Sequence, residues 1–222
     1  MRHIFILILS TFPLFVFAQS KSSKKGMSFP EDNRTFQGYL GLGLNASQVD
    51  GDGVAGYHQA GLSVAPAVAF KLGGRFYMNF EMAYHAVGAR WSPNQENYPN
   101  QNYISKLRYV AVPLFLNYHD PDGKVRLGGG IIYGQLFSAK EQINFYDVEN
   151  PLSTFQRRDL SWMANLQYMF APKWGLDTRF SYSLLYIRHY DNAIYKGYSV
   201  GNPVYGTSQY NNVITIRLFH IF

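Results

Sequence analysis

The sequence predicts an all-β fold, an eight-stranded antiparallel up-and-down transmembrane β-barrel. Three observations support this prediction: a two-residue alternation of apolar and polar side chains, connections that alternate between long and short, and a composition rich in aromatic residues and glycine. Hydrophobic residues make up 47% of the 222-residue chain, which contains 18 Tyr, 17 Phe and 20 Gly. Aromatic side chains favour strands over helices.

The alternation is clearest in the last run of the chain, where Ile214, Ile216 and Leu218 alternate with Thr215 and Arg217. Successive side chains of a strand face opposite sides, so a closed sheet of such strands has one apolar surface and one small or polar surface. A soluble, lipocalin-like barrel would place its apolar surface inside. Because the polar surface suits a narrow interior and the apolar one is too extensive to face water, we expect the apolar surface to contact lipid.

Eight segments carry this alternation, and each exceeds the roughly 9–11 residues that a tilted spanning strand needs. Their ranges are 36–48, 57–71, 76–91, 103–119, 124–139, 158–170, 174–189 and 209–222. The second, fourth and sixth connections are short and contain Gly, Pro or Asp, whereas the other four are longer. In outer-membrane barrels the short turns face the periplasm, so we expect both chain ends there. Pro66 and Pro113 lack an amide donor, and we expect a local irregularity at each.

The N-terminal residues predict export. Arg2 and His3 precede an apolar run over 4–17, and Ala18 completes a small-residue cleavage site. We expect residues 1–18 to be a signal peptide, 19–35 a periplasmic leader and 36–222 an outer-membrane barrel domain. An N-terminal membrane anchor is the alternative, but the run is shorter than a spanning helix requires. The chain contains no cysteine, which excludes disulfides and an N-terminal lipoprotein anchor.

Charges within the predicted lumen form the candidate site. A charge that faces a narrow interior is costly unless it is paired. The polar side of the strands, close to their periplasmic ends, carries two carboxylates and three guanidinium groups that we expect to form one network: Glu81, Arg126, Asp177, Arg179 and Arg217. This network would serve either as a static ionic core or as a gate that opens by exchanging partners.

The remaining features predict few ligands. The net charge of +6 is scattered, which argues against nucleic-acid binding. The turn at 50–53 and the histidines lack metal-ligand spacing, so no metal or cofactor is expected. Expected partners are outer-membrane lipid, the barrel-assembly machinery and other envelope proteins. We expect the barrel-assembly machinery to recognise a C-terminal assembly signal formed by Ile216, Leu218 and Phe222. Aromatic residues at strand ends, with Tyr103 among them, are expected to form interfacial girdles.

Several segments resemble the PorT-like outer-membrane β-barrel family of the Bacteroidetes group, and the likeness covers about residues 36–222. The residues that carry it lie at 43–52, 56–61, 80–84 with Gly88, 107–116 and 179–184. The strand around Pro113 is the most specific of these. Ala111 stands where the family usually has Glu, so a lumen carboxylate common in the family is missing. The resemblance implies an integral outer-membrane protein. One namesake works in type IX protein secretion, while most relatives have no assigned role.

Taken together, these features favour a non-enzymatic barrel with a structural or interaction role, as an accessory to envelope assembly or protein secretion. A narrow pore for small solutes is the alternative. A lipid-modifying enzyme is a third class, for which Ser183, His85 and Asp159 are available on the polar side. Because no signature surrounds any serine, nothing in the sequence marks these three as a catalytic set.

Overall fold

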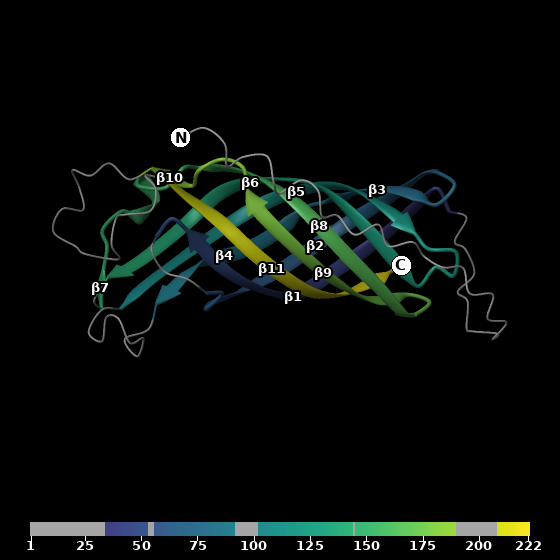
Figure 1. Cartoon of the computed structure of the whole chain (residues 1–222), viewed down its shortest axis with the longest axis horizontal. Helices are drawn as coiled ribbons and strands as arrows, with labels where there is room; N and C mark the ends of the chain where they lie inside the picture. Colours follow the sequence, from purple (N-terminus) through teal and green to yellow (C-terminus); the bar gives the residue numbers. More distant parts are fainter. Residues whose placement is uncertain (1–33, 53–55, 92–101, 144, 190–207) are drawn as a thin grey trace, which may run out of the picture.

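The computed structural model describes residues 34–52, 56–91, 102–143, 145–189 and 208–222. The predicted signal peptide and nearly all of the leader lie outside these residues. The described chain forms a barrel whose long axis runs horizontally in Figure 1. Within these residues no helix is long and apolar enough to cross a membrane.

Eight antiparallel spanning segments close the ring, which confirms the predicted fold class. In ring order they are β1 (Phe36–Asp50), β2 (Gln59–Gly73), β3 with β4 (Phe76–Glu81 and Ala83–Trp91), β5 (Tyr103–His119), β6 (Val125–Ile143), β8 (Arg158–Ala171), β9 (Trp174–Ser183) and β11 (Ser208–Ile221). β11 pairs with β1, from Tyr39 opposite Ile221 to Asp50 opposite Tyr210, so the described sheet has no spanning edge strand. Three short elements lie outside the ring: β7 (Tyr146–Asp147), the 3-10 helix η1 (Pro151–Ser153) and β10 (Arg188–His189).

The two ends of the barrel differ. The three short turns lie at the end where β11 finishes, whereas β7, η1 and β10 lie at the other end (Figure 1). In outer-membrane barrels the short turns face the periplasm. We therefore call the first end periplasmic and the second extracellular.

The third spanning strand is interrupted at Met82, between the two prolines. Opposite β2, the ladder pairs stop at Ala67 and resume at Val64, which brackets Pro66. Opposite β5, the ladder pairs stop at Leu114 and resume at Ala111, which brackets Pro113. The expected irregularities are therefore present, but they fall in the strand between the prolines, while Pro113 keeps a continuous ladder with β6.

The seventh spanning strand is shorter than predicted. It was expected to run over 174–189, but β9 ends at Ser183 and the chain turns before β10. The amide of Leu184 donates to the carbonyl of Leu160, and the amide of Ile187 donates to the carbonyl of Gln209. The turn buries Ile187 completely in an apolar cluster inside the barrel. The four consecutive apolar or aromatic residues at 184–187 end the alternation, and the chain turns there to bury Ile187.

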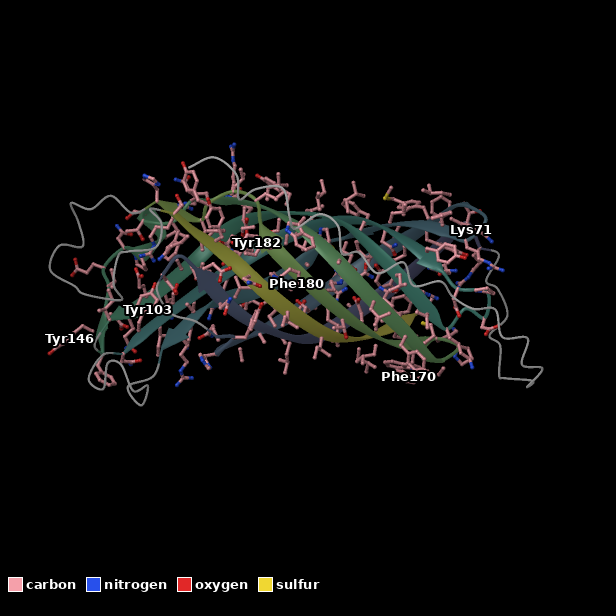
Figure 2. All side chains as sticks on the ribbon, viewed as in Figure 1. Lys71, Tyr103, Tyr146, Phe170, Phe180 and Tyr182 are labelled. Carbon is pink, nitrogen blue, oxygen red and sulfur yellow. The ribbon has the colours of Figure 1, made fainter. Side chains whose placement is uncertain are left out.

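The alternation places apolar side chains outside and polar ones inside, and Figure 2 shows largely carbon side chains projecting outward along the middle of the barrel. Leu42, Leu44, Leu116, Leu166 and Ile216 are exposed, whereas Asn45, Ser63, Asn117, Gln167 and Thr215 are buried. Around the periplasmic end, exposed aromatic side chains form the expected girdle: Phe76, Tyr118, Tyr168, Phe170 and Trp174. In a membrane these rings lie at the headgroup level.

Glycine in β1 makes room for a large lumen side chain. Gly43 lies opposite Arg217 in the ladder. A Cβ atom on Gly43 would stand 2.0 Å from the carbonyl oxygen of Ile216 and 2.5 Å from the Cα of Arg217. These are backbone atoms of the neighbouring strand, so neither can move aside without disturbing the ladder. The absence of a side chain at this position therefore sets how close β1 approaches β11.

We predict that Gly43→Ala lowers the free energy of unfolding by about 1–3 kcal/mol, the usual cost of overpacking. The matched control is Gly38→Ala in the same strand, where the nearest atom to an added Cβ is 3.5 Å away on the Phe222 ring. Urea unfolding of both variants in phospholipid vesicles measures the difference. Equal stability of the two variants would contradict the close approach at Gly43.

Candidate functional site

Two carboxylates and two guanidinium groups meet in the periplasmic half of the lumen. Glu81 ends β3, Asp177 and Arg179 lie on β9, and Arg217 lies on β11. Arg179 donates from Nη1 to Glu81 Oε2 at 2.9 Å and from Nε to Asp177 Oδ2 at 2.8 Å. Arg217 donates from Nη1 to Glu81 Oε2 at 3.0 Å and from Nη2 to Asp177 Oδ2 at 2.6 Å. Each carboxylate therefore binds both guanidinium groups.

These four residues, which we call the lumen network, are almost completely removed from solvent. Glu81 and Asp177 are 0% exposed, Arg217 is 2% exposed and Arg179 is 5% exposed. Two positive and two negative formal charges cancel, so the network carries no net charge into the low-dielectric interior. Bidentate pairing of a guanidinium with a carboxylate adds geometric specificity to this electrostatic balance.

Neighbouring side chains fix the lumen network in place. The hydroxyl of Tyr39 donates to Glu81 Oε1 at 2.8 Å. The guanidinium carbon of Arg179 lies 4.6 Å from the centre of the Phe115 ring, in cation–π geometry. Gly43 leaves the space that the Arg217 side chain crosses. Charge balance, hydrogen bonding and packing therefore all restrict the network to one arrangement.

The structure brings together four of the five charged residues that the sequence singled out, while the fifth, Arg126, lies beside an aromatic ring. The guanidinium carbon of Arg126 lies 6.0 Å from the centre of the Phe219 ring. In the ladder, Gln167 separates Arg126 from Asp177. Proximity to the same barrel end therefore does not place Arg126 on a strand adjoining that of Asp177, and its membership of the network stays a prediction.

Small cavities lie on the extracellular side of the lumen network. One is lined by Glu81, Arg179 and Arg217 together with His85 and Ala111. A second continues from His85 and Ala111 toward the extracellular end. Each has room for about one water molecule. Ala111, which stands in place of a carboxylate usual in the resembling family, lines both cavities and adds no charge to this nearly filled part of the lumen.

A polar cluster around Asp159 follows the second cavity. Asp159 Oδ2 accepts hydrogen bonds from Ser183 Oγ at 3.0 Å and from Asn211 Nδ2 at 3.0 Å. His85 lines the same cavity, but its Nδ1 lies 3.4 Å from the amide nitrogen of Asn45. A nucleophilic serine needs its base within hydrogen-bond reach. Ser183 instead contacts the carboxylate directly, so the three residues considered for catalysis do not form a triad.

A second buried ion pair lies near the extracellular end, and the sequence did not reveal it. Arg188 Nη2 donates to Glu141 Oε1 at 2.6 Å, and the Tyr103 hydroxyl donates to the same oxygen at 2.7 Å. The guanidinium carbon of Arg188 also lies 3.9 Å from the centre of the Phe155 ring. Tyr103 is therefore a lumen residue, and its predicted place in the outer girdle was wrong. Glu141 had been expected in a loop, which is why this pair went unrecognised.

Apolar clusters cover the polar layers at both ends of the lumen. Toward the periplasm, Tyr39, Tyr77, Met169, Phe219 and Ile221 pack together. Toward the extracellular end, a larger cluster includes Leu107, Leu136, Phe155, Ile187 and Val213. The described lumen is thus a stack of apolar and hydrogen-bonded layers.

Metal binding has no support in the described part of the chain, where no three His, Cys, Asp or Glu residues come together. At the turn considered for calcium, Asp50 accepts hydrogen bonds from Gln48 at 2.8 Å and from Asn212 at 3.2 Å. Gly53 of that turn lies outside the described residues. These contacts are those of a hydrogen-bonded surface turn.

A closed ring with an apolar exterior and a filled interior defines an integral outer-membrane β-barrel. The family model for the outer membrane protein beta-barrel domain matches residues 17–187. The chain therefore belongs to this family, and the protein is located in the outer membrane.

Comparison with solved structures gives the same fold. The attachment invasion locus protein Ail of Yersinia pestis is similar at 15% identity and a TM-score of 0.50, covering 85% of this chain and all of its own. Neisserial surface protein A is similar at 12% identity and a TM-score of 0.45, covering 85% of this chain and 98% of its own. A comparison with curated proteins found no match.

We predict that Glu81→Ala lowers the free energy of unfolding by about 3–5 kcal/mol, because it leaves two buried guanidinium groups with one carboxylate. Thermal and urea unfolding in detergent, followed by circular dichroism, measures the effect. Asp122→Ala removes an exposed carboxylate from a periplasmic turn and is the control. An unchanged melting midpoint for Glu81→Ala would argue against the network as a source of stability.

Proposed function

We propose that this barrel has a structural or interaction role in the outer membrane and does not conduct solutes. The observation that carries the proposal is the lumen network, which joins β3, β9 and β11 across the interior. Apolar clusters lie on both sides of the polar layers, and the cavities between them have room for about one water molecule each. A solute path would require these layers to separate.

Opening a path through the lumen network would also expose unpaired charges. Removing one partner from a buried ion pair costs about 3–5 kcal/mol, and the network contains several such pairs. The static ionic core is therefore favoured over the gate. With the lumen closed, the surfaces left for function are the extracellular connections, the periplasmic rim and the outer wall.

Conductance measurements distinguish the closed barrel from the alternative, a narrow pore for small solutes. We predict that the purified full-length barrel shows no steady openings in planar phospholipid bilayers, because the lumen layers remain packed. Insertion is verified independently by protection of the barrel from protease. Stable, sizeable current steps from correctly inserted protein would refute the closed-lumen proposal.

For the biological setting, we propose a PorT-like protein of the Bacteroidetes type that assists envelope assembly or protein secretion. The segments around Pro113 and 179–184 support this through their resemblance to that family. The experiment is mild crosslinking in intact cells followed by purification of the barrel and identification of the proteins attached. Reproducible recovery of secretion or assembly components supports the proposal, and recovery of only abundant, unrelated porins contradicts it.

We also propose that the barrel-assembly machinery recognises the terminal strand during assembly, through Ile216, Leu218 and Phe222. Ile216 and Leu218 are exposed on the outer face, and the Phe222 side chain is 60% exposed. Its backbone amide donates to the carbonyl of Gly38 at 3.0 Å. Exposure means that these side chains contribute little to internal packing, so their alternation is available to an assembly partner before the ring closes.

We predict that Phe222→Ala reduces the amount of folded barrel in the outer membrane of growing cells. Phe36→Ala is the matched control, because Phe36 is 59% exposed and lies at the same barrel end outside the terminal strand. Both purified variants should unfold at the same urea concentration, which separates assembly from stability. Equal amounts of the two variants in the membrane would rule out a special role for the terminal residue.

No catalytic role is part of the proposal. Ser183 and Asp159 are buried in the lumen and hydrogen-bonded to each other, whereas the ring nitrogen Nδ1 of His85 lies beside Asn45. Incubation of the purified barrel with labelled phospholipid tests this directly, since release of labelled fatty acid that is lost in Ser183→Ala would establish the enzyme alternative.

A further inference from the structure

The outer wall at the extracellular end carries a cluster of basic side chains on one side of the barrel. It consists of five exposed residues from four neighbouring strands, which we call the basic wall patch: Arg90, Lys106, Arg108, Lys140 and Arg158. In the ladder, Lys106 lies opposite Lys140, Arg108 lies opposite Ser138 and Arg90 lies opposite Ile104. In the sequence the same residues are spread over almost seventy positions, so only the register brings them together.

These side chains point toward the membrane and not into the lumen. Leu107 and Tyr109, which alternate with Lys106 and Arg108, are completely or almost completely buried. Because alternate residues of a strand face opposite sides, the two cations must face outward. Arg158 follows the same rule, since its neighbour Asp159 is buried in the lumen cluster.

The height of the patch matches the outer headgroup layer. Below Arg108, the outward positions of β5 are apolar or aromatic down to Tyr118 at the periplasmic girdle: Val110, Val112, Leu114 and Leu116. A strand tilted by about 40° rises about 26 Å over that stretch. The apolar band of an outer-membrane barrel is about 25 Å tall. Arg108 therefore lies where the acyl chains end, and Lys106 lies slightly above it.

The charges of the patch are not balanced by the described protein. None of the five residues forms an ion pair within the described ranges. Two carboxylates of the described chain, Asp147 and Glu149, follow the end of β6 without forming an ion pair with the patch, and Asp147 accepts a hydrogen bond from Gln142 at 3.3 Å. Lys106 and Lys140 occupy directly opposed positions in the ladder, an arrangement that destabilises a sheet unless an anion lies between the charges.

The opposite wall at the same end lacks such charges, which distinguishes the patch from a general ring of interfacial cations. There the described residues of β1 and β11 present Gln48, Asp50 and Tyr210, with Asn212 nearly buried beside them. Asp50 binds both amide side chains, so this side is hydrogen-bonded internally. Binding to headgroups in general would not require the asymmetry.

Apolar side chains lie directly beside the cations. The ladder between β5 and β6 shifts at Arg108, which leaves Phe137 as an extra residue on the exposed face. The Phe137 ring lies 6.1 Å from the ring of Tyr84. β-bulges often re-aim side chains at binding sites. An anionic group held by the cations would thus have aromatic surface available for its attached acyl chains.

We propose that the basic wall patch binds an outer-leaflet lipid that carries phosphate groups on its headgroup, of the phosphorylated glycolipid class. Lys106, Lys140 and Arg108 hold the phosphate, while Phe137 and Tyr84 contact the upper acyl chains. Arg90 and Arg158 extend the patch along the headgroup layer. The proposal concerns a lipid partner of the wall and does not depend on the proposed secretion role.

The test uses the full-length barrel in detergent micelles, with diphosphorylated lipid A as probe and native mass spectrometry as readout. We predict that Lys106→Gln, Arg108→Gln and Lys140→Gln together weaken binding about 100-fold, because each cation near an anionic lipid surface contributes roughly fivefold. The matched control replaces Arg75, Lys124 and Lys173 at the periplasmic end by Gln, which removes the same charge. This control should bind as the unaltered protein does.

Chemically dephosphorylated lipid A should bind weakly to all variants, and millimolar inorganic phosphate should not compete. Three results would each overturn the proposal. The two triple variants could be weakened equally, the dephosphorylated lipid could bind as tightly as diphosphorylated lipid A, or inorganic phosphate could displace the lipid. Because the altered side chains are exposed, the triple variant should fold, and its melting midpoint without lipid should equal or exceed that of the unaltered protein, since the repulsion between Lys106 and Lys140 is removed. If it does not fold, Lys106→Gln alone is compared with Lys124→Gln, for which an equal affinity would again overturn it.

Discussion

The structure depends on one constraint: a charge removed from water must meet an opposite charge with its hydrogen bonds satisfied. A narrow barrel with an apolar exterior directs its polar side chains inward, so its lumen must solve this problem internally. The lumen network balances its charges with Glu81 and Asp177 shared between Arg179 and Arg217, and all the hydrogen bonds to Asp177 go to Oδ2, which leaves the buried Oδ1 without a partner. Its members come from the neighbouring strands β9 and β11 and from β3 on another part of the ring, so the same contacts also join the wall across its interior.

Closure of the lumen determines where function can reside. The lumen network, the Asp159 cluster and the Glu141–Arg188 pair form polar layers, and apolar side chains pack toward both ends of the lumen. Family membership and location in the outer membrane follow from the chain as a whole. The activity we propose therefore belongs to the outside of the barrel, its connections and its rim. The basic wall patch gives that outside surface a definite chemical preference on one side.

The sequence predicts the strands of the barrel wall far better than the contacts among the side chains of the lumen. β5 has the predicted bounds, 103–119, because alternation is a local property of each strand. The end of β9 at Ser183 escaped prediction because burial of Ile187 is a tertiary effect. The pairing of Glu141 with Arg188 was missed because partner choice depends on register between strands distant in sequence. The basic wall patch was overlooked for the same reason, since its residues look scattered along the chain.

The central claim, that the lumen network is a mutually dependent unit holding the barrel closed, is tested most directly by a double-mutant cycle. Glu81→Gln, Arg217→Met and the double variant are unfolded in urea from phospholipid vesicles. We predict a coupling free energy of about 1–3 kcal/mol between the two positions, as expected for groups in one buried network. Additive effects of the two substitutions would show that the charges do not depend on each other and would contradict the account.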